Sequence, residues 1–324
     1  MMLAAQLFYA GAVVLRIATV APDGTMWARE MKAMAHEVEA ATRGGVRLKW
    51  YWGGIAGDEA EVESRILREQ LEGTASGGQT CLRHAPSLRV MRIPGLFSSR
   101  DEAHYVIGAL RKEIDEEFRR AGFVNLSTLV LGTDIVFLRG NAHSLAELRR
   151  LRLWRWDSDD PAIGLTRAMG IPIIPTAISQ AGAALDAGEV DGLIAIPAAV
   201  LAFQWYGRLK SFIDFPFSQV SACVIVTQRA FAKLPHEHQQ ALLAAGAKLR
   251  ARSEIVVRDQ DDALTGGLFE RQGLKRMVLS DSERGELLEA ARASRQRLDE
   301  TKIPHPLLER VLTLLADWRL EHRK

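Results

Sequence analysis

The sequence predicts an α/β fold made of two similar halves. Segments with strand-like and helix-like patterns alternate along most of the chain, and this order implies parallel sheets flanked by helices. The 324 residues are enough for two domains of ordinary size. Hydrophobic residues make up 48% of the chain and charged residues 25%, a composition typical of globular proteins.

Three strands separated by two helices are expected in the first half. In order, they are a β-rich run at 13–21, an amphipathic helix at 26–42, an alternating strand at 46–52, a glycine-rich turn and helix at 53–73, and a buried strand at 74–78. Ligands of such sheets bind beyond the carboxyl ends of the strands. The segments at these ends, APDGT, WGGIAG and SGGQT, are rich in glycine, and they contribute the candidate ligand-binding residues Asp23, Gly77 and Gly78.

A similar alternation follows in the rest of the chain. The expected elements are a long amphipathic helix at 99–122, strand-like runs at 124–140, a strand–helix series at 144–196, a strand-rich segment at 212–231 and a long helix from about Pro235 that bridges both halves. Asp157, Asp159 and Asp160 are expected to cap the helix that starts at Pro161 rather than to bind a metal ion.

The charge distribution argues against nucleic-acid binding. The 42 Lys and Arg residues nearly balance the 40 Asp and Glu residues, and basic side chains alternate with acidic ones instead of forming one basic face. Residues 1–12 resemble the apolar region of a secretory signal and predict export to the periplasm, with an apolar tail before the first strand as the alternative. This stretch is too short to span a bilayer, which takes about 20 apolar residues.

The two cysteines leave their pairing open. A disulfide between Cys81 and Cys223 and two free thiols are both compatible with the sequence. Cys81 lies three residues before His84, so a stand-alone enzyme with a thiol nucleophile is one alternative function. Because no third group that would orient such a pair is evident, we expect no enzymatic activity, no cofactor and no metal site.

Several segments resemble one known family of binding proteins. They are LRIATVAPDGT and its continuation (15–59), RIPGLFSSRDEAH (92–104), SLAELRRLRLW (144–154), AMGIPIIPTAISQAGAALDAGEVDG (168–192) and AFAKLPHEHQQALL (230–243). In their order and spacing the chain is similar to the DctP-type solute-binding proteins of tripartite ATP-independent periplasmic (TRAP) transporters. The resemblance implies a two-domain clamp of the periplasmic-binding-protein type, which closes on a ligand and delivers it to membrane permease subunits.

The clamp expectation divides the chain into two lobes. We expect the first lobe to comprise residues 13–137 and 221–262. The second lobe, with the C-terminal helices, then comprises residues 138–220 and 263–324.

One departure from the family falls on its main ligand-binding position. Most members have an arginine that pairs with the substrate carboxylate, whereas this chain has Trp154 there, followed by Arg155. Strand alternation places Trp154 and Trp156 on one face and Arg155 on the other, although a register shift of one residue would exchange them. The chain is similar to a subgroup of the family that has this Trp-x-Trp pattern and lacks the arginine.

The two tryptophans predict a ligand with apolar surface, and packing in the core is their alternative role. A hydrogen bond to a charged group contributes about 1.5–3 kcal/mol. Burial of one large apolar side chain contributes a similar ~1.5–3 kcal/mol, so indoles can replace an arginine only for a partly apolar ligand. The remaining candidate ligand-binding residues are Trp27 beside the PDGT loop, Phe97 in PGLFSS, Pro197 in the apolar run after VDG, and Gln204 and Trp205 at the end of that run.

The main rival is a protein that binds an organic acid through a different cation. Arg152, Arg155 and Arg139 are the candidates for that role.

Overall fold

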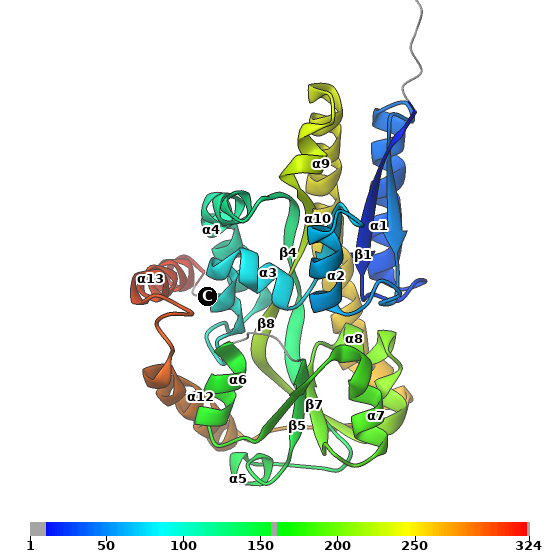
Figure 1. Ribbon diagram of the computed structural model, residues 1–324. Helices are drawn as coiled ribbons and strands as arrows, with labels where there is room; N and C mark the ends of the chain where they lie inside the picture. Colours follow the sequence, from blue (N-terminus) through cyan, green and yellow to red (C-terminus); the bar gives the residue numbers. More distant parts are fainter. Residues whose placement is uncertain (1–10, 157–160, 323–324) are drawn as a thin grey trace, which may run out of the picture.

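The computed structural model describes residues 11–156 and 161–322. The first ten residues of the expected leader lie outside this range, and so do Asp157, Asp159 and Asp160 with their expected capping role. Figure 1 shows an elongated α/β molecule in which α10 runs along its length. The predicted α/β clamp is confirmed, because helices cover a mixed sheet that extends through two lobes.

One sheet runs through both lobes, and in the described residues it has nine strands. Their order is β2-β1-β3-β8-β4-β7-β5-β6, with β9 beside β8. The strands are β1 (Val13–Thr19), β2 (Val46–Tyr51), β3 (Gly73–Ser76), β4 (Phe123–Leu138), β5 (Leu153–Trp156), β6 (Ile173–Thr176), β7 (Gly192–Ala195), β8 (Ser211–Thr227) and β9 (Lys275–Met277). We call the β2-β1-β3 side the first lobe and the β7-β5-β6 side the second lobe.

The long strands β4 and β8 belong to both lobes. They pair antiparallel from Phe123–Thr227 at one end to Leu138–Ser211 at the other. Their register shifts at three places, and Gly132 lies at one of them with φ of 154°. The strand-like runs expected at 124–140 are therefore one bent strand, and glycine is suited to the bend because it lacks the Cβ that disfavours positive φ.

Helices cover both faces of each lobe. The first lobe has α1 (Met26–Ala41), α2 (Glu59–Leu67), α3 (Gln79–His84), η1 (Pro86–Arg92), α4 (Arg100–Arg120), α9 (Gln228–Ala232) and α13 (His305–Glu321). The second lobe has α5 (Leu145–Leu148), α6 (Pro161–Ala168), η2 (Ile178–Gln180), α7 (Ala181–Asp186), α8 (Pro197–Ala202), η3 (Trp205–Arg208), η4 (Leu264–Leu268), α11 (Phe269–Arg271), α12 (Asp281–Ser294) and η5 (Arg295–Arg297).

Helix α10 (His236–Ala263) contacts both lobes, as the pattern after Pro235 predicted. It packs on α1 and β4 of the first lobe and reaches α8 of the second. Arg252 of α10 forms ion pairs with Glu30 and Glu37 of α1, at 2.7 and 2.6 Å. These contacts fix the helix against the first lobe.

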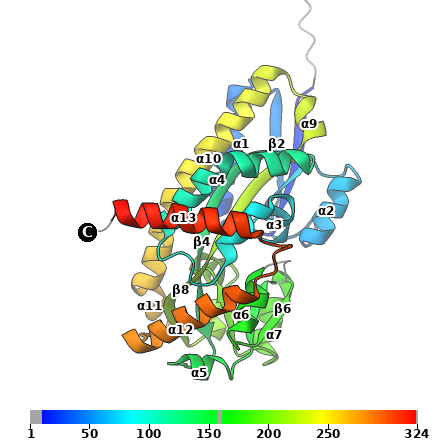
Figure 2. The ribbon, with the colours of Figure 1, turned by 90° about the vertical axis from the view of Figure 1, so that its left-hand side faces the viewer.

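The C-terminal helix α13 lies on the first lobe and not, as expected, on the second. Leu308, Val311 and Leu315 of α13 join the apolar core that surrounds α4. The guanidinium of Arg319 donates to both carboxylate oxygens of buried Glu102, at 2.7 and 2.8 Å. Figure 2 shows α13 crossing beside α4 while α12 stays with the second lobe, so the chain crosses between lobes once more after α12.

A disulfide joins Cys81 of α3 to Cys223 of β8, with 5.8 Å between the two Cα atoms. This settles the pairing that the sequence left open, and it leaves Cys81 without the free thiol that a nucleophile requires. Disulfides persist mainly in oxidising compartments.

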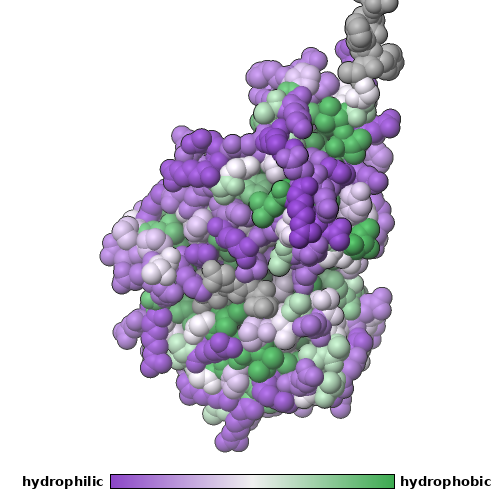
Figure 3. All heavy atoms as spheres, viewed as in Figure 1, coloured by the Kyte–Doolittle hydropathy of each residue, from purple (hydrophilic) through white to green (hydrophobic). Residues whose placement is uncertain are grey.

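Hydrophilic residues dominate the face of the molecule seen in Figure 3, and hydrophobic ones form small separate groups. Within the described part of the chain, no helix is both long and apolar enough to cross a membrane.

Candidate ligand-binding site

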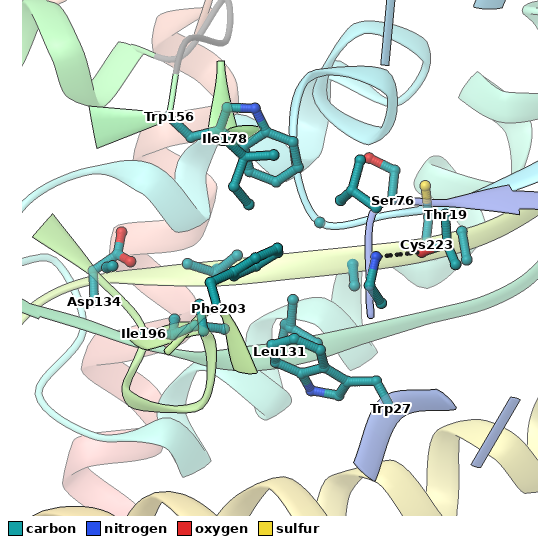
Figure 4. Close-up of a pocket in the computed structure, with 18 of the residues that line it drawn as sticks. Thr19, Trp27, Ser76, Leu131, Asp134, Trp156, Ile178, Ile196, Phe203 and Cys223 are labelled. Carbon is teal, nitrogen blue, oxygen red and sulfur yellow. Dashed lines mark hydrogen bonds between the residues drawn. The ribbon is translucent and has the colours of Figure 1, made fainter. Parts of the chain in front are cut away.

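A cavity lies between the two lobes, beside the bent strands β4 and β8. It holds about 1030 Å³ of empty space, part of which is open to solvent. Its polar lining side chains are the charged residues Arg92, Asp134 and Arg155 and the hydroxyl residues Thr19, Ser76 and Ser253. The other walls are mainly apolar and aromatic, and Figure 4 shows Phe203 projecting between Trp156 and Ile178 on one side and Leu131 and Trp27 on the other.

Trp154 combines the two roles weighed for it, since it lines the cavity but is almost wholly buried. Its exposed fraction is 2%, and it belongs to the apolar core of the second lobe. The indole N–H donates to the Thr176 hydroxyl at 2.8 Å, and the ring meets that of Trp205 edge-to-face at 5.3 Å. These contacts hold the ring in place, so that it forms a fixed wall of the cavity.

Trp156 is only partly buried and faces the first lobe. A Cβ on Gly78 would lie 2.9 Å from Cη2 of Trp156 and 2.9 Å from a carboxylate oxygen of Glu59. A side chain at position 78 would therefore require the Glu59 carboxylate and the Trp156 ring to shift. This close approach explains the glycine, although Gly78 is not itself a lining residue.

A charged cluster lies at the end of the cavity opposite Ser76. The Arg155 guanidinium donates to Asp134 Oδ2 at 2.8 Å and to the Ser218 hydroxyl at 2.9 Å. Arg92 of the first lobe also forms an ion pair with Asp134 Oδ2, at 3.3 Å. Because Asp134 lies on β4, its carboxylate links an arginine from each lobe at the base of the cavity.

The expected opposite orientation of Arg155 is only half correct. Arg155 does leave Trp154 and Trp156 to reach Asp134 and Ser218, and just 1% of its surface is exposed. It nevertheless lines the same cavity as both tryptophans. β5 pairs with β7 only through Leu153 and Trp154. No residue of β7 pairs with Arg155, and its side chain reaches Asp134 of β4 and Ser218 of β8.

A hydrogen-bonded group from the first lobe meets the other end of the cavity. The Ser76 hydroxyl is hydrogen-bonded to Glu59, and the backbone N–H of Gly78 donates to Ser76 Oγ at 3.0 Å. The N–H of Thr80 donates to the second Glu59 oxygen at 3.1 Å. Burial raises the pKa of Glu59 to about 7 although these hydrogen bonds lower it.

The other residues predicted from the sequence divide into two sets. Trp27, Gly77 and Trp205 line the cavity. The remaining four do not line it. Asp23 is exposed and paired with Lys32, Phe97 is in the core of the first lobe, Pro197 is buried at the start of α8, and Gln204 is exposed with φ of 56°.

Of the three cations named as candidates for binding an organic acid, only Arg155 reaches the cavity. Arg152 is exposed and forms an ion pair with Asp191 at 3.1 Å. Arg139 lies near Asp191 in a surface hollow at the far end of the second lobe. Sequence reasoning did not identify Arg92, Asp134 or Glu59, although Asp134 is the one charged residue in the segment 123–138.

The sequence matches the family model described as bacterial extracellular solute-binding protein, family 7, over residues 17–301. The chain belongs to this family. A relative named solute-binding protein, from Verminephrobacter eiseniae, is 26% identical over 237 residues, which are 71% of this chain and 68% of the relative. The family is that of the extracytoplasmic receptors of TRAP transporters, which bind solutes and are not enzymes.

Solved structures share the fold of this family 7 protein. The sugar acid binding protein DctPAm of Advenella mimigardefordensis, in complex with galactonate, has a TM-score of 0.87 at 17% identity and covers 94% of this chain and 98% of its own. DctP7 of Bordetella pertussis, a receptor binding pyroglutamic acid, has a TM-score of 0.83 at 20% identity and covers 93% and 100%. A TRAP solute-binding protein of Desulfovibrio salexigens with bound orotic acid has a TM-score of 0.83 at 18% identity and covers 94% and 99%.

Proposed function

We propose that this protein is a periplasmic TRAP receptor that captures a small, partly apolar solute between its lobes and delivers it to membrane permease subunits. The cavity lining carries the proposal: indole, phenyl and aliphatic groups make up most of the walls of the cavity between the two lobes. The family supports export and delivery to a permease.

The position that carries an arginine in most of the family supports an apolar contact. We assign Trp154 to that position, and its ring is held by Thr176 and Trp205. The arginine next to it, Arg155, is engaged with Asp134 and Ser218. A ligand therefore meets more apolar than polar surface, and each large apolar group that it buries contributes about 1.5–3 kcal/mol.

The released ligand tests this proposal. The protein is purified rapidly from a periplasmic extract and denatured, and the small molecules set free are identified by mass spectrometry against a denatured blank. We expect a molecule with an aromatic ring or a branched aliphatic group. Recovery of a small dicarboxylate or a polyhydroxylated acid without apolar surface would contradict the proposal.

An organic-acid receptor is the second candidate, and the charged cluster favours it. Both Arg92 and Arg155 line the cavity, and the structural relatives were solved with galactonate, pyroglutamic acid and orotic acid. The same mass spectrometry separates the two candidates, because a compact acid supports this one and a mainly apolar molecule supports the first.

A further inference from the structure

The Ser76 hydroxyl occupies a defined place in the hydrogen bonds that border the cavity. Ser76 ends β3 and lines the cavity, and its Oγ accepts the Gly78 N–H at 3.0 Å. Its second partner is a carboxylate oxygen of Glu59. A hydroxyl has one hydrogen to donate and two lone pairs that can accept. The hydrogen bonds to Gly78 and Glu59 therefore determine whether Ser76 can still donate to a ligand or accept from it.

Glu59 is the first residue of α2 and is buried behind Ser76, with an exposed fraction of 7%. Its other oxygen accepts the Thr80 N–H, and Gly78 lies between the carboxylate and the ring of Trp156. A carboxyl group in such surroundings gains a proton more readily than one in water, and burial raises the pKa of Glu59 to about 7.

We propose that Glu59 is a positioning residue that determines, through the Ser76 hydroxyl, whether the first lobe offers the ligand a hydrogen-bond donor or an acceptor. When Glu59 is ionised, Ser76 must donate its hydrogen to the carboxylate, and one lone pair is left for the ligand. When Glu59 is neutral, its own O–H donates to Ser76 Oγ. Both lone pairs are then used, by Glu59 and Gly78, and the Ser76 hydrogen is free to bind an acceptor on the ligand.

The charged neighbours of Glu59 do not supply a cation that would keep it ionised, within the described part of the chain. Asp58 caps the same helix and raises the pKa of Glu59 further. Glu63, one turn along α2, is paired with Arg83 and His84 of α3. β3 contributes Ser76 and β5 the uncharged Trp156, so the two protonation states exchange near neutral pH.

This inference rests on the proposed apolar cavity, and two matched probes test both together. 4-Fluoroacetophenone has a ketone that only accepts hydrogen bonds, and 1-fluoro-4-isopropylbenzene has a similar size, with a methyl group in place of the oxygen. Neither compound titrates, so any dependence of binding on pH comes from the protein. Dissociation constants are measured by fluorine NMR at pH about 5.5 and about 8.5, on either side of the pKa of Glu59.

We expect the ketone to bind about fivefold more tightly at the lower pH, the effect of one hydrogen bond of about 1 kcal/mol. Binding of the isopropyl compound should not depend on pH. In Glu59→Gln the amide N–H₂ donates permanently to Ser76, so the ketone should bind tightly at both pH values. In Ser76→Ala the hydroxyl is absent, so the ratio of the two probes' dissociation constants should not change with pH. This variant tests the proposal if Glu59→Gln does not fold.

Glu117→Gln is the matched control. Glu117 is a partly buried acid whose pKa, like that of Glu59, is raised by burial, and it also accepts a hydrogen bond from a serine, Ser87, at 2.8 Å. Neither residue lines the cavity, so this variant should keep the pH profile of the unmodified protein.

The possible outcomes distinguish failure of the proposed role of Glu59 from failure of the proposed apolar cavity. A ketone affinity in the unmodified protein that does not change with pH would overturn the role of Glu59 and leave the apolar cavity standing. An unchanged pH profile in Glu59→Gln would also overturn the role of Glu59. Failure of both probes to bind at either pH would overturn the apolar cavity, and the inference with it.

Discussion

Trp154 and Trp156 share a strand, but their contacts give them different roles. Trp154 is 2% exposed and donates a hydrogen bond to Thr176, so it contributes to the stability of the second lobe as well as to the cavity wall. Trp156 is only partly buried and approaches Gly78 across the gap between the lobes. A substitution at each position therefore separates stability from binding.

We expect Trp156→Ala to weaken binding of the released ligand about tenfold or more, because up to ~1.5–3 kcal/mol of apolar contact is lost. Trp154→Phe removes the hydrogen bond to Thr176 and should lower the free energy of unfolding by about 1 kcal/mol. Isothermal titration calorimetry and urea denaturation measure the two effects. Unchanged affinity in Trp156→Ala would mean that this ring does not touch the ligand.

At this scale the sequence predicted the aromatic part of the site better than the charged part. The i, i+2 spacing placed Trp154 and Trp156 together at the cavity. No pattern within one segment brings Arg92 to Asp134, because the two residues come from different elements and meet only when the lobes are assembled. The one indication in the sequence was Asp134 itself, a single acid in a long apolar strand. A carboxylate buried there needs a cation or a hydrogen-bond donor beside it.

At the scale of elements, local patterns predicted the strands and the longer helices of the first lobe closely, but not the short helices α3, η1 and α9. The helix expected at 26–42 is α1, Met26–Ala41, whose N-cap Thr25 accepts the Ala28 N–H. The position of α13 could not be predicted in this way. Its amphipathic pattern shows that one face is buried, but the choice of the first lobe depends on Glu102 and the core around α4.

The disulfide is the covalent tie between elements, and its loss gives a prediction at this scale. It joins α3 to β8 across 142 residues, so it restricts the unfolded chain strongly. Replacing both Cys81 and Cys223 with alanine should lower the free energy of unfolding by about 2–5 kcal/mol, measured by urea denaturation.

Reduction with dithiothreitol should destabilise the unmodified protein and leave the double variant unchanged. If the reductant has no effect on the unmodified protein, the two cysteines are not paired in solution.

At the scale of the whole molecule, the two lobes share their sheet. β4 and β8 pair over their full length, from Phe123–Thr227 in the first lobe to Leu138–Ser211 in the second. α10 contacts both lobes, and the segment between α12 and α13 crosses between them again, with Arg295 donating to the Gly95 carbonyl at 2.8 Å. We therefore expect closure on a ligand to take place as bending of β4 and β8, with Gly132 as the candidate position of the bend, rather than as movement of two independent bodies.

The shared strands also predict how the protein unfolds. Loss of either lobe would expose the paired edges of β4 and β8 and one side of α10, so neither lobe is expected to remain folded alone. Differential scanning calorimetry should show one transition, with a calorimetric enthalpy equal to the van't Hoff enthalpy. The released ligand should move this single transition to higher temperature without splitting it, because the proposed site is formed by both lobes of the folded state. Two resolved transitions, of which only one responds to the ligand, would mean that the lobes fold separately and that the ligand contacts one of them.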